Sequence, residues 1–223
     1  MIQVAVVIGY MDDFQGYDPL LLRAVPSSAR ADAYVALRSL GREGSPTRSD
    51  LIQDTYARVA YYPEIYVAGE LVQIPTRIYY PWPQDEQFDG LSASERVIFA
   101  AWMSRNGDGR IRQRALRILL DSELPWTVPF VVQLCAEYVF QIGQDILQFV
   151  TVNLREKPHL LAAYVQFTND NPDFMALCTQ RATSYWAIYG WQLKKDDYPQ
   201  FAALRALAEL ARNSQLLAIP STI

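Results

Sequence analysis

Beyond residue 90, hydrophobic residues recur every three to four positions, which is the spacing of an amphipathic α-helix. The spacing predicts six helices, which begin near Ser92, after Gly109, near Val128, at Pro158, at Pro172 and near Pro199. Connections of roughly four to nine residues favour antiparallel neighbours. We therefore expect a mainly α protein, built as an up-down helical array. It resembles HEAT-type repeat proteins in architecture alone, because no motif recurs at a fixed period.

The helix predicted at about residues 128–152 is the longest, and its polar face is rich in carboxamides. That face carries Gln133, Glu137, Gln141, Gln144, Asp145 and Gln148. A face open to solvent usually carries Lys and Glu, whereas carboxamides suit a face that another element partly covers. We therefore expect this helix to be central, with neighbours on more than one side.

Short polar motifs mark the ends of the predicted helices. The turn Asn106-Gly-Asp-Gly109 ends the first helix, and we expect its glycines at positive φ. Asn171, before Pro172, predicts a helix N-cap. The turn also overlays part of an EF-hand loop, but Ser104 and Ala115 stand where that loop needs carboxylates. No calcium site is expected there.

The first 90 residues are mixed in character. Helices are predicted at about residues 28–40 and 46–60. The segments Ile65–Ala68 and Leu71–Ile74 predict a β-hairpin, since each is apolar and β-prone and Gly69 lies between them. Prolines and acids in residues 81–90 predict a linker into the helical array.

These patterns divide the chain into two regions. Residues 1–90 form a mixed α/β region with the tyrosine-rich hairpin and the linker, and residues 91–223 form the six-helix array. We expect the two regions to pack as one unit. Whether residues 1–10 form a strand or a buried helix stays open.

Composition narrows the class of protein. The chain has 223 residues, of which 51% are hydrophobic and 20% charged, which excludes a disordered chain. The net charge of −4 argues against nucleic acid or an anionic membrane as the main partner. No apolar run is long enough for a membrane span, and the opening run to Ile8 is too short for a secretory signal. We expect an acidic cytoplasmic protein.

The chain carries little catalytic equipment. It has one histidine, His159, and two cysteines, Cys135 and Cys178, which fall on apolar helix faces and predict buried reduced thiols. One His and two Cys cannot build a Cys/His zinc site. No glycine-rich phosphate loop is present, so no catalytic residue, metal ligand or cofactor is assigned. Whether the protein is an enzyme stays open, and the balance is against it.

Five arginines lie close together around the first interhelical turn: Arg105, Arg110, Arg112, Arg114 and Arg117. Because the turn leads into a helix N-terminus, one interpretation is contact with phosphate, nucleic acid or an acidic protein. The other is a solvated face paired with Asp121, Glu123 or the acids of residues 85–89. No aromatic residue interrupts the arginines, which argues against single-stranded nucleic acid.

Arg181 occupies the centre of an aromatic and aliphatic helix stripe, where Leu or Ala would be expected. A buried guanidinium must be paired. We therefore expect a bridge between helices, to Glu137 or Asp145. The alternative is a pocket that binds a carboxylate or a phosphate against Tyr185 and Trp186.

Aromatic residues gather before the linker, and the candidate interface comprises Tyr61, Tyr62, Tyr66, Tyr79, Tyr80 and Trp82. Tyrosine and tryptophan are enriched at protein interfaces. Adjacent pairs such as Tyr79 and Tyr80 cannot both point inward on one strand. Either some of these rings meet a partner protein, or the segment lies across the helical array and buries them.

Three functional hypotheses remain. The first is a cytoplasmic protein-interaction module, such as an adaptor, an assembly factor or a neutralising partner, which binds through the tyrosine-rich segment or the arginine turn. The second is a protein or enzyme that binds a small molecule or an anion in a pocket around Arg181. The third is nucleic-acid contact through the arginines, which the net charge makes the weakest of the three.

Overall fold

A computed structural model describes residues 19–38 and 64–218, and the prediction of a mainly α fold is confirmed. Within those residues, ten α-helices pack against one another beside a two-stranded sheet. The helices are α2 (Pro19–Arg23), α3 (Arg30–Arg38), α5 (Asp85–Asp89), α6 (Ala93–Met103), α7 (Gly109–Asp121), α8 (Val128–Leu134), α9 (Phe140–Thr151), α10 (Pro158–Asp170), α11 (Pro172–Tyr185) and α12 (Pro199–Ala218). The strands are β1 (Ile65–Val67) and β2 (Glu70–Val72). Short helical turns are η2 (Ser27–Ala29), η3 (Pro125–Thr127), η4 (Asn153–Glu156), η5 (Trp186–Gly190) and η6 (Lys195–Asp197).

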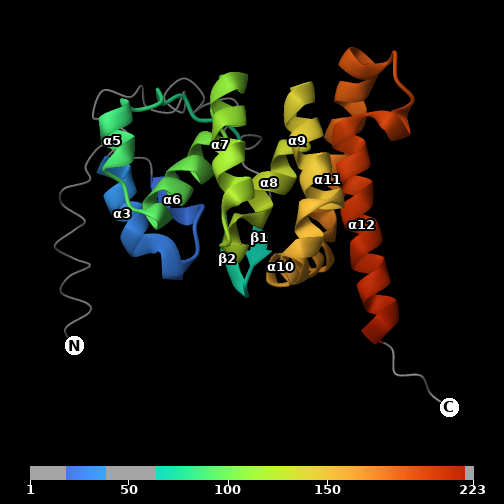
Figure 1. Cartoon of the computed structure of the whole chain (residues 1–223), viewed down its shortest axis with the longest axis horizontal. Coiled ribbons are helices and arrows are strands. Elements are labelled where there is room, and N and C mark those ends of the chain that lie inside the picture. Colours follow the sequence, from blue (N-terminus) through green and yellow to red (C-terminus); the bar gives the residue numbers. More distant parts are fainter. Residues whose placement is uncertain (1–18, 39–63, 219–223) are drawn as a thin grey trace.

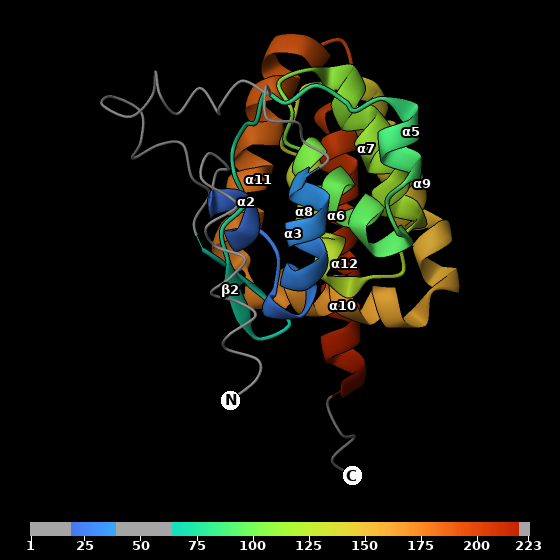
Figure 2. The same ribbon diagram turned by 90° about the vertical axis from the view of Figure 1, so that its left-hand side faces the viewer.

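The helices form a row along the long axis of the molecule (Figure 1). Helix α3 packs on α6, α6 on α7, and α7 on α9. The order then departs from the expected up-down sequence, because α9 packs most extensively against α12 and not against the next helix, α10. Helix α10 lies crosswise beneath the helices of the row, and α12 occupies the place beside α9 (Figure 2).

The prediction of one long helix at about residues 128–152 is wrong, because α8 ends at Leu134 and α9 begins at Phe140. Between them the chain leaves the helical path, and Glu137 on this connection is fully buried. The glutamines also separate. Gln133 is buried in α8, whereas the glutamines of α9 are exposed, so the prediction of a covered carboxamide face fails for α9.

The predicted hairpin is confirmed, with Ile65 opposite Val72 in an antiparallel register. It is tied to the helices by Asn171, whose side-chain oxygen accepts from the Tyr66 amide at 2.7 Å and whose amide donates to the Tyr66 carbonyl at 2.9 Å. Asn171 precedes α11 as predicted, but its side chain makes no capping hydrogen bond because it is committed to the hairpin. The segment predicted as a linker contains α5.

Of the two helices predicted before the hairpin, the first is present as α3, shortened to Arg30–Arg38 and preceded by η2. The second, at about residues 46–60, lies outside the described residues, as do residues 1–10.

The turn between α6 and α7 follows the predicted boundaries, but its glycines serve another purpose. Neither Gly107 nor Gly109 has a positive φ. A Cβ at Gly107 would lie 2.6 Å from the Tyr79 ring, and one at Gly109 would lie 3.0 Å from Val139. These positions are therefore glycine because neighbouring side chains come close to the backbone.

One hydrophobic cluster runs through the described part of the chain, from Leu21 to Leu207. Trp102, fully buried on α6, donates its indole N–H to the Leu21 carbonyl at 2.9 Å and so joins α6 to α2. The helices and the hairpin therefore share a core. None of the described helices is long and apolar enough to cross a lipid bilayer.

Candidate functional site

A buried group of charges joins four segments of the chain, and we call Glu137, Arg77, Arg105 and Arg112 the Glu137 cluster. Arg77 binds both carboxylate oxygens of Glu137, with Nη1 to Oε1 at 2.6 Å. Nη2 of Arg105 lies 3.0 Å from Oε1, and Nη2 of Arg112 lies 3.9 Å from Oε2. All but Arg77 are fully buried, so the protein holds these charges away from solvent.

The same arginines hold the backbone around the cluster. Arg105 donates to the carbonyls of Pro75 and Thr76, and Nη1 of Arg112 donates to the carbonyls of Asn106 and Gly107. The segment before α5, the turn between α6 and α7, and the connection between α8 and α9 are therefore fixed to one carboxylate. Burying charges in this way requires partners for each of them.

Electrostatics keep Glu137 ionised. Burial alone would raise the pKa of Glu137, but the positive charges of Arg105, Arg77 and Arg112 outweigh it and hold the pKa at about 2. The carboxylate therefore stays negative at neutral pH and is not placed to exchange a proton in a reaction. We interpret the Glu137 cluster as a structural tie.

The five arginines predicted as one contact surface separate in the structure. Arg105 and Arg112 are fully buried in the Glu137 cluster and cannot meet an anion at the surface. Arg114 lies 3.4 Å from Asp85 and 4.3 Å over the Trp82 ring, as in the interpretation that paired this face with the acids of residues 85–89.

The two remaining arginines, Arg110 and Arg117, are exposed on α7. They lie about two helical turns apart on the same helix, so they are not gathered into one anion site. A nucleic-acid surface built from all five side chains is therefore not formed.

The bridge expected from Arg181 to Glu137 or Asp145 is not among the ion pairs within the described residues. Glu137 pairs with the three arginines of its cluster, and Asp145 accepts a hydrogen bond from Gln113 at 3.3 Å. Arg181 itself is half-buried on α11.

Large aromatic and aliphatic side chains, all but one of them exposed, gather where α11 ends, next to the connection between α8 and α9. We call them the aromatic crest, and they are Tyr138, Tyr185, Ile188, Tyr189, Trp191 and Leu193. Trp191 is 65% exposed, and Ile188 and Tyr189 are each 62% exposed. Large hydrophobic residues exposed together, unlike single ones, mark interaction sites.

Three tyrosines form the inner side of the crest. The ring centroids of Tyr138 and Tyr189 lie 5.6 Å apart, and Tyr185 lies 5.8 Å from Tyr138 and 6.2 Å from Tyr189. These are distances of direct ring contact. The rings therefore form a continuous platform and leave no space for a ligand between them.

The local backbone holds the crest in shape. After α11 the helix widens into the π-helical turn η5, an arrangement often found at functional sites. The indole N–H of Trp186 donates to the Leu193 carbonyl at 3.0 Å and closes the loop. A Cβ at Gly190 would lie 2.6 Å from the ring of buried Tyr198, so only glycine lets the loop pack there.

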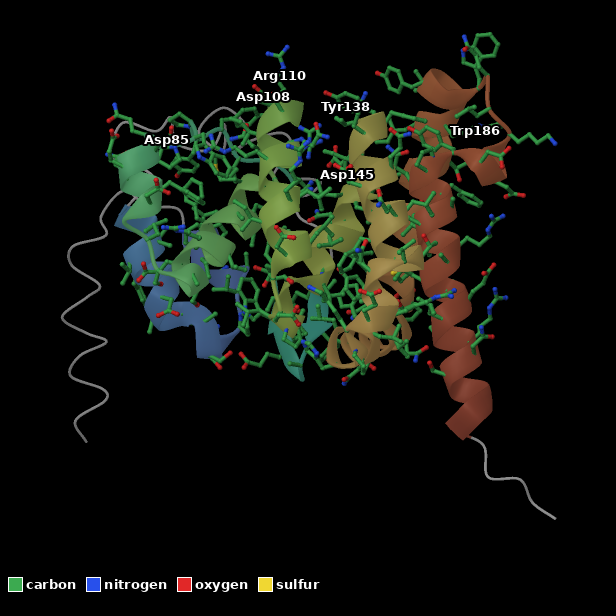
Figure 3. The ribbon with its side chains drawn as sticks, in the orientation of Figure 1. Asp85, Asp108, Arg110, Tyr138, Asp145 and Trp186 are labelled. Carbon is green, nitrogen blue, oxygen red and sulfur yellow. The ribbon has the colours of Figure 1, made fainter. Side chains whose placement is uncertain are left out.

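The crest and the Glu137 cluster are neighbours. Tyr138 follows Glu137 directly, and the guanidinium of Arg112 lies 5.6 Å from the centre of the Tyr138 ring. Figure 3 shows Tyr138 near the same end of the array as Asp108 and Arg110, with Trp186 beside α12. The cluster therefore contacts the crest at Tyr138, through Arg112.

The tyrosine-rich segment predicted as an interface divides between surface and core. Tyr66 and Tyr79 are 51% and 40% exposed, whereas Tyr80 is buried. Trp82 is half-buried, with its ring centroid 5.2 Å from those of Phe88 and Phe99. The other two candidates, Tyr61 and Tyr62, lie outside the described residues.

The sequence did not predict the crest, because Tyr185 and Trp186 fit the apolar stripe of one regular helix and Tyr189 continues the same spacing. The signal was present in residues 186–193, where five large apolar side chains surround Gly190. A helix that ends in such a density of aromatic residues cannot bury all of them.

A surface groove of about 420 Å³ lies between α7 and α9. Its lining residues are Arg117, Leu120, Asp121, Asp145, Gln148, Phe149, Asn153 and Lys157. The lining carries two cationic and two acidic side chains, so it offers no net charge to an ionic ligand.

Metal and thiol chemistry find no support in the described part of the chain. No group of three or more His, Cys, Asp or Glu side chains there could hold a metal ion. The prediction of buried, unpaired cysteines is confirmed for both Cys135 and Cys178. Burial raises the pKa of each thiol, that of Cys178 to about 12, so neither is a nucleophile at neutral pH.

No protein-family model, curated protein or solved structure matches this chain.

Proposed function

We propose that this protein is a protein–protein interaction module and that the aromatic crest is its contact surface. The observation that carries the proposal is the exposure of Ile188, Tyr189 and Trp191 in and directly after the π-helical turn. Exposed apolar side chains cost stability and solubility, so their concentration at a fixed place favours a partner that covers them.

The chemistry of the crest suits a protein partner. Tyrosine and tryptophan supply large contact areas with little loss of conformational freedom, and they dominate the residues that contribute most to binding at interfaces. The loop is already closed by the hydrogen bond from Trp186 to Leu193, so binding would not have to order it. An adaptor, an assembly factor and a neutralising partner would all use such a surface.

The alternatives have less support. A ligand pocket around Arg181 would need space beside Tyr185 and Trp186, but Tyr185 packs in the tyrosine platform and Trp186 closes the loop. Arg105 and Arg112 are buried in the Glu137 cluster, so neither side chain can contact nucleic acid. We place the protein in the cytoplasm, since its buried unpaired thiols suit a reducing compartment.

The proposal can be tested by comparing two exposed aromatic sites on the same chain. Immobilised wild-type protein, Trp191→Ser and Tyr66→Ser are incubated with native lysate, and the retained proteins are quantified by mass spectrometry. Both residues are more than half exposed, so neither change should disturb the fold. We expect proteins retained by the wild type and by Tyr66→Ser to be lost from Trp191→Ser. The reverse pattern would assign the interface to the hairpin and contradict the proposal.

A further inference from the structure

We infer that the aromatic crest binds a second copy of this chain, in a two-fold symmetric dimer. The inference rests on the proposed function and specifies the partner. In a two-fold interface the same patch meets itself, so the patch must complement its own shape and charge.

The crest presents exposed apolar side chains that can form the centre of a dimer contact. Its four most exposed side chains are at least 43% exposed and three of them are aromatic. Together they present several hundred Å² of mostly apolar surface, near the largest patches that monomers usually leave open. A standard interface buries about 800 Å² on each partner. The crest would supply the apolar centre of such an interface, and the charged residues beside it would supply the rim.

The charges at the rim of the crest have both signs, so they can pair with the same charges of a second copy. The sequence after Leu193 is Lys194-Lys-Asp-Asp197, with two charges of each sign. The inner two have partners within the chain, because Lys195 lies 4.6 Å over the Phe201 ring and Asp196 lies 3.2 Å from Arg205.

The outer two charges, Lys194 and Asp197, are exposed and have no ion pair among the residues that the structure describes. A two-fold axis that passes between these two side chains would set Lys194 of one copy opposite Asp197 of the other, and it would do so twice. A partner of strong acidity or basicity would instead be matched by a rim of one sign.

The tyrosine platform adds a second self-complementary element. A tyrosine hydroxyl both donates and accepts a hydrogen bond, so the hydroxyls of Tyr138, Tyr185 and Tyr189 can pair with the same groups across the axis. Trp191, the most exposed residue of the crest, would pack on the platform of the other copy. Each copy thus supplies both the projecting ring and the surface that receives it.

Sedimentation velocity of the purified full chain between about 1 and 100 µM tests the inference. We expect the wild type to move from 25.4 kDa to twice that mass as concentration rises. Trp191→Ser should remain monomeric at every concentration. A wild type that stays monomeric, or a dimer that Trp191→Ser leaves intact, would overturn the inference.

Charge reversals give a test that depends on symmetry and not on folding. Lys194→Asp and Asp197→Lys should each weaken the dimer about tenfold, since each turns two attractive rim pairs into repulsive ones. The double variant restores opposite charges across the axis and should recover the wild-type dissociation constant. Glu156→Lys, an exposed reversal on η4, is the matched control and should leave dimerisation unchanged. A double variant no tighter than the single ones would overturn the two-fold arrangement.

The two proposals fail separately. If the protein is monomeric throughout while Trp191→Ser still loses proteins that the wild type retains from lysate, the crest binds a different protein and only the dimer is refuted. If neither measurement responds to Trp191→Ser, both proposals fail.

Discussion

The Glu137 cluster and the aromatic crest are neighbours with opposite arrangements of charged and apolar side chains. Arg105, Arg112 and Glu137 carry charges into the interior, while Tyr189 and Trp191 carry aromatic rings into solvent. Each reverses the usual preference of its residue type. Burying charged groups and exposing aromatic rings both cost stability. Of the two sites, only the cluster offsets this cost within the chain, through ion pairs and backbone hydrogen bonds. The comparison suggests that the cluster serves the fold and the crest serves a partner.

Glu137→Gln should produce the largest loss of stability. It removes the only carboxylate in the cluster and leaves buried guanidinium groups without their counter-charge, at a cost of about 3–5 kcal/mol. Urea unfolding followed by circular dichroism measures the change. Glu123→Gln is the matched control, because that carboxylate pairs with Lys157 at the surface and its loss should leave stability nearly unchanged. Equal losses in the two variants would remove the distinction between cluster and surface.

The cluster should also make stability depend on acid pH. The pKa of Glu137 falls from 4.5 to about 2 on folding, so its contribution is complete above about 4.5 and is lost as pH falls towards 2. The gap in unfolding free energy between the wild type and Glu137→Gln should therefore shrink by about 3 kcal/mol across that window. Urea titrations at several pH values measure it. A gap that stays constant would show that the carboxylate is not ionised in the cluster.

Gly190→Ala tests whether the crest is held rigid. An added methyl group would lie 2.6 Å from the Tyr198 ring and 3.2 Å from Trp186, so the loop must move. We expect a loss of about 1–3 kcal/mol and faster hydrogen exchange in residues 186–193. Gly90→Ala, whose new methyl would lie 3.4 Å from its nearest neighbour, is the control. Unchanged exchange in the loop would mean that Gly190 does not fix the shape of the crest.

Trp191→Ser should produce the smallest change in stability. The ring is 65% exposed, so its removal should shift the unfolding free energy by less than about 0.5 kcal/mol. Thermal unfolding of dilute protein measures this, while binding is lost as described above. A large destabilisation would show that Trp191 packs as a core residue and would weaken the contrast with the Glu137 cluster.

Much of the fold could be predicted from the sequence, because helix periods and end signals are local. The helix predicted to begin near Ser92, for example, is α6, and Ser92 caps it in a reciprocal box with Glu95. The contacts between segments that are distant in the sequence could not be predicted. Glu137 falls on the polar side of a regular helix pattern, and its burial is explained only by arginines such as Arg77 and Arg105, which come from distant segments. The local sequence predicts Asn171 as a helix cap, and it does not show that the side chain binds the hairpin.

The candidate sites were less predictable than the fold for the same reason. Arg105 and Arg114 look alike in the sequence, yet one lies in the core and the other on the Trp82 ring. Tyr189 continues the apolar spacing of α11, but it lies in the π-helical turn and is exposed. The spacing of hydrophobic residues in a sequence does not show where an α-helix changes into a π-helical turn.

Hydroxyl-radical footprinting tests most directly that the crest is a contact surface, whichever protein covers it. Oxidation of Tyr189 and Trp191 is compared between dilute purified protein and the tagged chain recovered from native lysate. We predict that both residues are protected in lysate while Tyr66 on the hairpin is oxidised equally in the two samples. Equal oxidation of Trp191 in both, or protection of Tyr66 alone, would contradict the account.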